Sequence, residues 1–126
     1  MAITQVNVST PAVEIIFTDT VIGNAADAIK ASSAKILYII ADNSQNVAAS
    51  YLKIWNTAAG SVTVGTTAPD LVIFLPASSV VTIPFFTGAA QGLTLTTALS
   101  AACVTTGGTA GTVSPSSAVV LTISYI

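Results

Sequence analysis

Five carboxylates are the side chains with the clearest capacity for acid–base chemistry. They are Glu14, Asp19, Asp27, Asp42 and Asp70. Glycoside hydrolysis needs two such groups that converge in one cleft. All five lie near the ends of predicted strands or in predicted loops, where solvated charge and turn capping are their ordinary roles. Asp70 follows Pro69 and is expected to hydrogen-bond its own backbone in a turn. The pattern predicts no catalytic pair and a protein that is not an enzyme.

Nucleophilic and metal chemistry find little support in the residue types present. Cys103 is the one cysteine, and the chain has no histidine to activate it. Its apolar neighbours predict a small buried hydrophobic side chain. Zinc is excluded because its sites depend on cysteine and histidine. Asp42, Asn43 and Asn46 come nearest to a calcium site, but they lack the spaced acidic residues of such loops. A solvated turn is the simpler interpretation, and we expect no metal and no cofactor.

Phosphate recognition is also poorly supported. The segment 107–111 (GGTAG) is rich in glycine, but it lacks the lysine and the following helix of a phosphate-binding loop. A flexible surface loop is therefore predicted there. Three lysines and a net charge of −2 are too little positive charge to neutralise a nucleic-acid backbone. Neither a nucleotide nor a nucleic acid is a predicted partner.

Aromatic and apolar side chains are the remaining candidates for recognition. Tyr51 and Trp55 share one face of a predicted strand, where they could stack on a sugar, anchor a subunit contact or belong to the core. Phe85 and Phe86 follow Pro84 and are expected at the edge of a sheet. The candidate subunit or partner contacts are Tyr51, Trp55, Phe85, Phe86, Ile3, Val6 and Val8.

The elements that must carry these residues are short strands. Runs rich in β-branched residues alternate with turn residues at intervals of roughly 8–12, which predicts an all-β fold. We expect a single antiparallel β-sandwich, jelly-roll-like, with an extended N-terminal segment. The clearest hairpin joins residues 49–56 to 61–64, and residues 24–33 form either a short helix or an irregular loop. The other predicted strands are 2–8, 13–18, 35–41, 71–75, 79–83, 92–97, 100–105 and 118–125.

Charge is the unusual feature of the composition. Charged residues make up 6% of the 126-residue chain, against about 25% in an average soluble domain, and none follows Asp70. Such a chain is expected to self-associate or to work packed against partners. The apolar runs are far shorter than the roughly 18 residues of a membrane span, and no signal-peptide pattern follows Met1. We divide this one domain into an N-terminal arm and connection, 1–32, and a sandwich, 33–126.

Two stretches carry a resemblance to a known class of proteins. They are residues 51–85 (YLKIWNTAAGSVTVGTTAPDLVIFLPASSVVTIPF) and 102–125 (ACVTTGGTAGTVSPSSAVVLTISY). Their order resembles that of small β-sandwich structural proteins of tailed bacteriophages, including those that infect cyanobacteria. The shared order is a YLKLW-like hairpin, VGT-x-x-P-D, two apolar strands separated by PA-x-x, a Thr/Gly-rich loop and a last apolar strand. The resemblance covers residues 33–126 and contains no catalytic motif.

The resemblance implies a component of the virion. The leading expectation is a capsid decoration (cement) protein, a homotrimer that binds the outer face of the major capsid shell and stabilises it. The alternative is a tail, fibre or baseplate component that binds a receptor or a carbohydrate. Residues 2–8 alternate polar and apolar side chains ahead of the resembling region. We expect this arm to add a strand to a neighbouring copy or to the major capsid protein.

Overall fold

The protein is built almost entirely of β-strands. The computed structural model describes residues 13–87 and 90–126, and within these ranges it contains eleven strands and one 3-10 turn. The strands are β1 (Ile15–Ile22), β2 (Asp27–Lys30), β3 (Ala34–Asp42), β4 (Ser50–Trp55), β5 (Leu71–Leu75), β6 (Val80–Pro84), β7 (Phe86–Thr87), β8 (Ala90–Gln91), β9 (Leu93–Leu95), β10 (Leu99–Val104) and β11 (Val119–Tyr125), and the turn is η1 (Ala59–Ser61). The predicted all-β class is confirmed.

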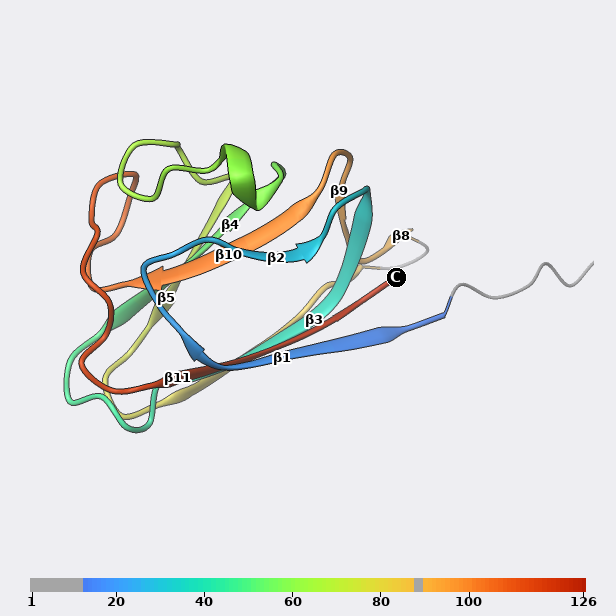
Figure 1. Ribbon diagram of the computed structural model, residues 1–126. Helices are drawn as coiled ribbons and strands as arrows, with labels where there is room; N and C mark the ends of the chain where they lie inside the picture. The colour runs from blue at the N-terminus through green and yellow to red at the C-terminus, as the bar shows by residue number, and fades with distance from the viewer. Residues whose placement is uncertain (1–12, 88–89) are drawn as a thin grey trace, which may run out of the picture.

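Nine of the strands form two antiparallel sheets packed face to face (Figure 1), and β7 and β8 form a separate two-stranded sheet. One sheet has the order β1-β11-β3-β6, with β9 paired to the start of β3, and the other has the order β2-β10-β4-β5. The pairs are nested along the chain: β4 with β5, β3 with β6, β2 with β10 and β1 with β11. One long hairpin rolled into two sheets gives this nesting, which is the arrangement of a jelly roll.

The core lies between the two sheets and is made of aliphatic side chains. Burial of this apolar surface is the main driving force for the packing. The fully buried aliphatic residues of the core include Ile36, Leu52, Ile54, Leu75, Leu99, Val119, Leu121 and Ile123. Cys103 belongs to the same core, as predicted. None of the described residues forms a helix long and apolar enough to cross a membrane.

The helix considered for residues 24–33 is wrong. Residues 27–30 form the edge strand β2, where Asp27 pairs with Ala101 and Lys30 with Leu99 of β10. Two turns of alanine-rich helix are marginal in isolation. A strand at this place instead buries Ile29 in the core, and that gain decides the local structure.

The predicted hairpin between 49–56 and 61–64 is also wrong. The partner of β4 is β5, with Ser50 opposite Leu75 and Ile54 opposite Leu71. Residues 56–70 form a loop that contains η1. The strand β5 lies beside β4 and buries Ile73 and Leu75 in the core. The segment 61–64 (SVTV) offers less apolar surface, so the more distant segment is the better partner.

Candidate functional site

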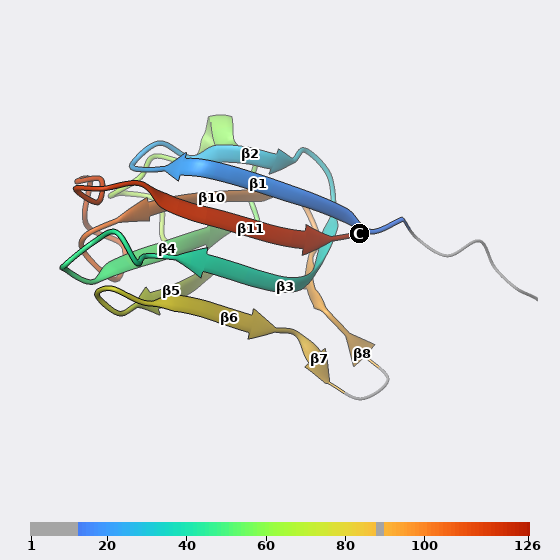
Figure 2. The ribbon, with the colours of Figure 1, turned by 90° about the horizontal axis from the view of Figure 1, so that it is seen from below.

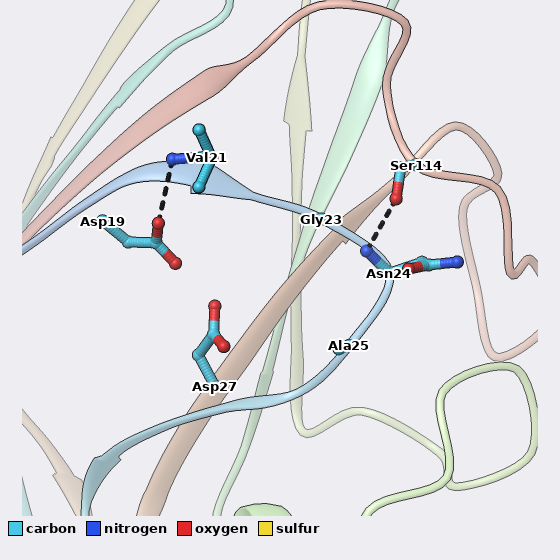
Figure 3. Close-up of a pocket in the computed structure, with 7 residues that line it drawn as sticks. All are labelled: Asp19, Val21, Gly23, Asn24, Ala25, Asp27 and Ser114. Atoms are coloured by element: carbon cyan, nitrogen blue, oxygen red, sulfur yellow. Dashed lines mark hydrogen bonds between the residues drawn. The ribbon is translucent and has the colours of Figure 1, made fainter.

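Two of the five carboxylates come together in the folded chain. Asp19 and Asp27 face each other across a cavity of about 360 Å³ at one edge of the sandwich (Figure 3). The residues lining the cavity are Asp19, Val21, Gly23, Asn24, Ala25, Asp27 and Ser114. The two aspartates are eight positions apart in the sequence, and only the pairing of β2 with β10 brings them close. Sequence reasoning missed this pair because it treated the intervening segment as a helix or loop.

The backbone of β1 fixes the direction in which the Asp19 carboxyl group points. Asp19 lies two residues after Phe17 on the face of β1 that packs toward the core. The pairing of β1 with β11 shifts register between Asp19 and Ile22, which is a bulge of the kind common at sheet edges. The amide N–H of Val21 donates a 2.9 Å hydrogen bond to Oδ1 of Asp19. The carboxyl group therefore holds the bulge in place.

The two carboxyl groups interact electrostatically. The pKa of Asp27 is raised from 3.8 to about 6, first by the hydrogen bond to Asp19, then by partial burial and by the repulsion between the two charges. The pair can hold one proton between two carboxyl groups. The Ser114 hydroxyl at the rim accepts a hydrogen bond from the Asn24 amide. Within the part of the chain that the structure describes, no three His, Cys, Asp or Glu side chains gather as a metal site.

Trp55 is buried, so the Tyr51–Trp55 stacking platform does not exist. The Trp55 side chain is 0% exposed, and its Nε1 donates a 3.0 Å hydrogen bond to the carbonyl oxygen of Thr67 in the 56–70 loop. Tyr51 is half-buried and contacts Phe74 of β5 instead. The two ring centroids are 5.4 Å apart and the planes are tilted by 56°. The aromatic pair near the surface is therefore Tyr51 with Phe74.

The other predicted contact residues have mixed outcomes. Phe85 is half-buried and packs against the core, and its amide N–H donates to the carbonyl oxygen of Leu37. The backbone of Phe86 pairs with Gln91 in the small β7–β8 hairpin. The remaining predicted contacts, Ile3, Val6 and Val8, lie outside the described residues.

The polar turn at 42–46 is not a solvated turn. Asn43 and Asn46 are 0% and 2% exposed. The Asn43 amide donates to the carbonyl oxygens of Ala48, Leu75 and Pro76, and Asn46 donates to Oδ1 of Asn43. Their side-chain oxygens are used in internal hydrogen bonds. The predicted solvated turn is therefore wrong for Asn43 and Asn46, which connect the β3–β4 turn to the start of the β5–β6 turn.

Asp70 closes a loop rather than capping its own turn. Its Oδ2 accepts a 2.6 Å hydrogen bond from the amide N–H of Asn56, at the other end of the 56–70 loop. The Asn56 side chain in turn accepts from the amides of Thr97 and Ala98. The predicted hydrogen bond of Asp70 to its own backbone turn is replaced by this closure.

Lys53 is a buried cation that no sequence pattern predicts. It lies on the outer face of β4 and is 0% exposed, because the 105–118 loop covers it. Its Nζ donates to the carbonyl oxygens of Ala110 at 2.7 Å and Thr109 at 3.4 Å. Burial lowers the pKa of Lys53. The glycine-rich segment 107–111 is thus an ordered cover, in which Gly107 packs directly on the Tyr51 ring.

The opposite edge of the sandwich carries exposed apolar side chains and no charge. Strands β5 and β6 are the edge strands of the two sheets on this side of the sandwich and are joined by a short turn (Figure 2). Val72, Phe74 and Val80 on their outer faces are 36%, 53% and 56% exposed. No residue from 71 to 84 is charged. We call this region the β5–β6 edge.

Comparison with known proteins supplies no family for this chain. The sequence matches no protein-family model, and neither a curated protein nor a solved structure gives a significant match.

Proposed function

We propose that this chain is a non-enzymatic structural protein of a virus particle, acting as a capsid decoration (cement) protein. In this role it binds the outer face of the major capsid shell as a homotrimer and stabilises the shell. The resemblance of residues 33–126 to small β-sandwich proteins of tailed bacteriophages supports the viral setting. The low charge of the chain supports a function in which its surface is covered by other protein subunits.

The β5–β6 edge is the observation that carries this proposal. An edge strand exposes unpaired backbone groups, and free-standing proteins commonly protect such strands with charged side chains. This edge has none, and Phe74 leaves about half of its surface exposed. Aromatic side chains at the centre of a contact are frequent anchors of binding energy. A second copy of this chain is the occupant we assign to the edge, since an uncharged surface suits contact with its own kind.

The N-terminal arm is assigned to contacts outside the sandwich. Ile3, Val6 and Val8 are interspersed with the polar residues Thr4, Gln5 and Asn7, a composition suited to adding a strand to the edge of a neighbouring sheet. Deletion of residues 1–10 is expected to abolish binding to the capsid or assembly of the trimer, with an unchanged β-rich circular dichroism spectrum. Normal assembly of the truncated protein would show that the arm has no such role.

The Tyr51–Phe74 pair favours a second candidate, a receptor- or carbohydrate-binding part of a tail, fibre or baseplate. The exposed Phe74 ring offers an apolar face of the kind that can pack against a sugar ring. A glycan-binding screen with the wild type and Phe74→Ala separates the candidates. Glycan binding that Phe74→Ala removes supports the tail component and contradicts the decoration protein.

Mass in solution and position in the particle test the leading proposal. We expect sedimentation at micromolar concentration to give three times the 12.6 kDa chain mass, and electron microscopy of the particle to place the chain on the shell. A monomer at these concentrations, or density for the chain only on the tail, would overturn it.

A further inference from the structure

The Asp19–Asp27 pair joins two edge strands that belong to different sheets. No backbone hydrogen bond connects β1 to β2, because each pairs only with its own sheet. We propose that Asp19 and Asp27 form a proton-sharing latch, which holds β1 against β2 when one proton is shared and releases β1 when both groups are ionised. This inference is independent of the viral role proposed above.

Both carboxyl groups point into the gap between the sheets. Asp19 shares the inward face of β1 with Phe17, which packs on the core. Asp27 shares the inward face of β2 with Ile29, which is buried. Figure 3 shows the two carboxyl groups pointing toward each other from the two strands. They therefore close the rim of the sandwich at the place where the core ends.

The turn between the two strands is anchored, so repulsion acts on β1. The carbonyl oxygen of Gly23 accepts a 2.8 Å hydrogen bond from the Cys103 amide of β10. The Asn24 side chain donates a 2.7 Å hydrogen bond to the Thr112 carbonyl. These bonds fix residues 23–24 to the second sheet and its loop. Strands β1 and β2 are both edge strands with an interrupted ladder. Because residues 23–24 are tied to the second sheet, to which β2 belongs, we expect the repulsion to displace β1, whose ladder is interrupted beside Asp19.

No cation lines the cavity among the described residues. On the neighbouring strands, the Cys103 thiol lies in the core and the Tyr125 hydroxyl donates to the Ile29 carbonyl. The Lys30 ammonium, at the other end of β2, lies 5.9 Å from the centre of the Tyr125 ring. Residues 1–12 contain no ionisable side chain. A second negative charge in the pair is therefore uncompensated at close range.

The direction of the pH effect follows from the raised pKa of Asp27. The folded chain binds this proton more tightly than the unfolded chain, because the pKa is about 6 when folded against an ordinary value of 3.8. The stabilisation is complete below pH 3.8 and is lost as the pH rises through about 6. The latch is thus closed in mild acid and open at neutral pH and above.

Amide hydrogen exchange measured strand by strand tests the latch. After correction for intrinsic exchange rates, we expect protection of the β1 amides to fall about tenfold between pH 5 and pH 7, since solvent screening reduces the full effect of the shift. Protection of the β5 amides is expected to stay constant. Asp27→Asn should abolish the change in β1, and Asp19→Asn provides the same test if the first variant folds poorly.

Asp42→Asn is the matched control, because Asp42 is the last residue of β3, does not line the cavity and accepts a hydrogen bond from the Ser44 amide through its own Oδ1. It should keep the wild-type profile of β1 between pH 5 and pH 7. Constant protection of β1 in the wild type would overturn the proposal. So would a pH effect that survives both Asp27→Asn and Asp19→Asn, or one that is equal in every strand.

Discussion

The two open edges of this sandwich are built differently. At the β1–β2 edge, exposed apolar residues such as Ile16 stand beside a bulge and the inward-facing carboxyl groups of Asp19 and Asp27. At the β5–β6 edge, Phe74 and Val80 are exposed and no charged residue is present. The sheets and the core between them are common to both edges. The two edges therefore differ in the charge and regularity of the strands that they expose.

The difference shows which edge is protected from other chains. A bulge and inward-pointing charges are two devices that discourage strand-to-strand association, and the β1–β2 edge has both. The β5–β6 edge is interrupted only by Pro76 and Pro84. Because charge is scarce throughout this chain, we propose that the placement of charge at the β1–β2 edge directs self-association to the β5–β6 edge. The predictions below test this contrast in order of decreasing effect.

A charge at the β5–β6 edge should have the largest effect. Phe74→Lys is expected to weaken self-association about a hundredfold, or about 3 kcal/mol, since a buried anchor is replaced by an ammonium group that must be desolvated. Sedimentation velocity over a concentration series measures this. Val113→Lys is the control, because Val113 is 63% exposed on the 105–118 loop. Equal weakening by both variants would show that the edge is not the contact.

Lys53 holds the 105–118 loop over the outer face of β4. Loss of this contact should expose β4 to solvent beside the already exposed strand β5. Lys53→Ala removes the hydrogen bonds to Ala110 and Thr109 and leaves a gap under the loop. We expect unfolding to become easier by about 2 kcal/mol, measured by urea denaturation. Lys53→Met keeps the aliphatic stem and should cost less. A wild-type stability of Lys53→Ala would mean that the loop is held by other contacts.

Lys53 also predicts a dependence on alkaline pH. Because its pKa is lowered in the folded state, the unfolded chain holds this proton more tightly. The stability of the wild type should therefore rise as the pH increases through the lowered pKa toward 10.5. Lys53→Met should lack this rise in urea denaturation measured across the same range. The same rise in both proteins would contradict the assignment.

Removal of charge from the β1–β2 edge should make the two edges alike. The double variant Asp19→Asn/Asp27→Asn keeps the shape of both side chains but removes the repulsion. At pH 8 we expect it to be more stable than the wild type by about 1 kcal/mol, after allowance for solvent screening. It should also form larger assemblies by light scattering, since the β1–β2 edge then lacks the two carboxylates that discourage strand-to-strand association. Unchanged assembly would show that these charges do not protect the edge.

The smallest effect is expected inside the sandwich, beside the β5–β6 edge. The hydroxyl oxygen of Ser50 on β4 is buried and finds no hydrogen-bond partner among the residues that the structure describes. Ser50→Ala should stabilise the protein by about 1 kcal/mol, because it removes a buried polar group left unsatisfied. Thermal unfolding measures the gain, and self-association should not change. A loss of stability would indicate that the hydroxyl group has a partner in solution.

Much of the fold is predictable from local pattern. The segments 35–41, 71–75 and 118–125 are dense in β-branched and apolar residues, and all three form strands close to the predicted bounds. Errors arose where the local preference is weak. Residues 24–33 have no strong preference for helix, strand or loop. The segment 61–64 has the residue types of a strand, but β4 pairs with β5 instead.

The candidate sites were less predictable, because they depend on which distant residues meet. Trp55 is covered by the 56–70 loop, and Asn43 and Asn46 are buried by segments far along the chain. Whether a side chain at such a position faces solvent, core or partner cannot be read from its neighbours in sequence.

The sequence by itself determined the all-β class, the low charge and the absence of charge after Asp70, because these follow from composition and short-range periodicity. Only the tertiary structure decided the nested strand pairing, the burial of Lys53 and the meeting of Asp19 with Asp27. The physical reason is that pairing partners are selected by the total apolar surface buried across the whole chain. A segment with a weak local preference, such as 24–33, takes the conformation that gives the whole chain the lowest free energy of packing.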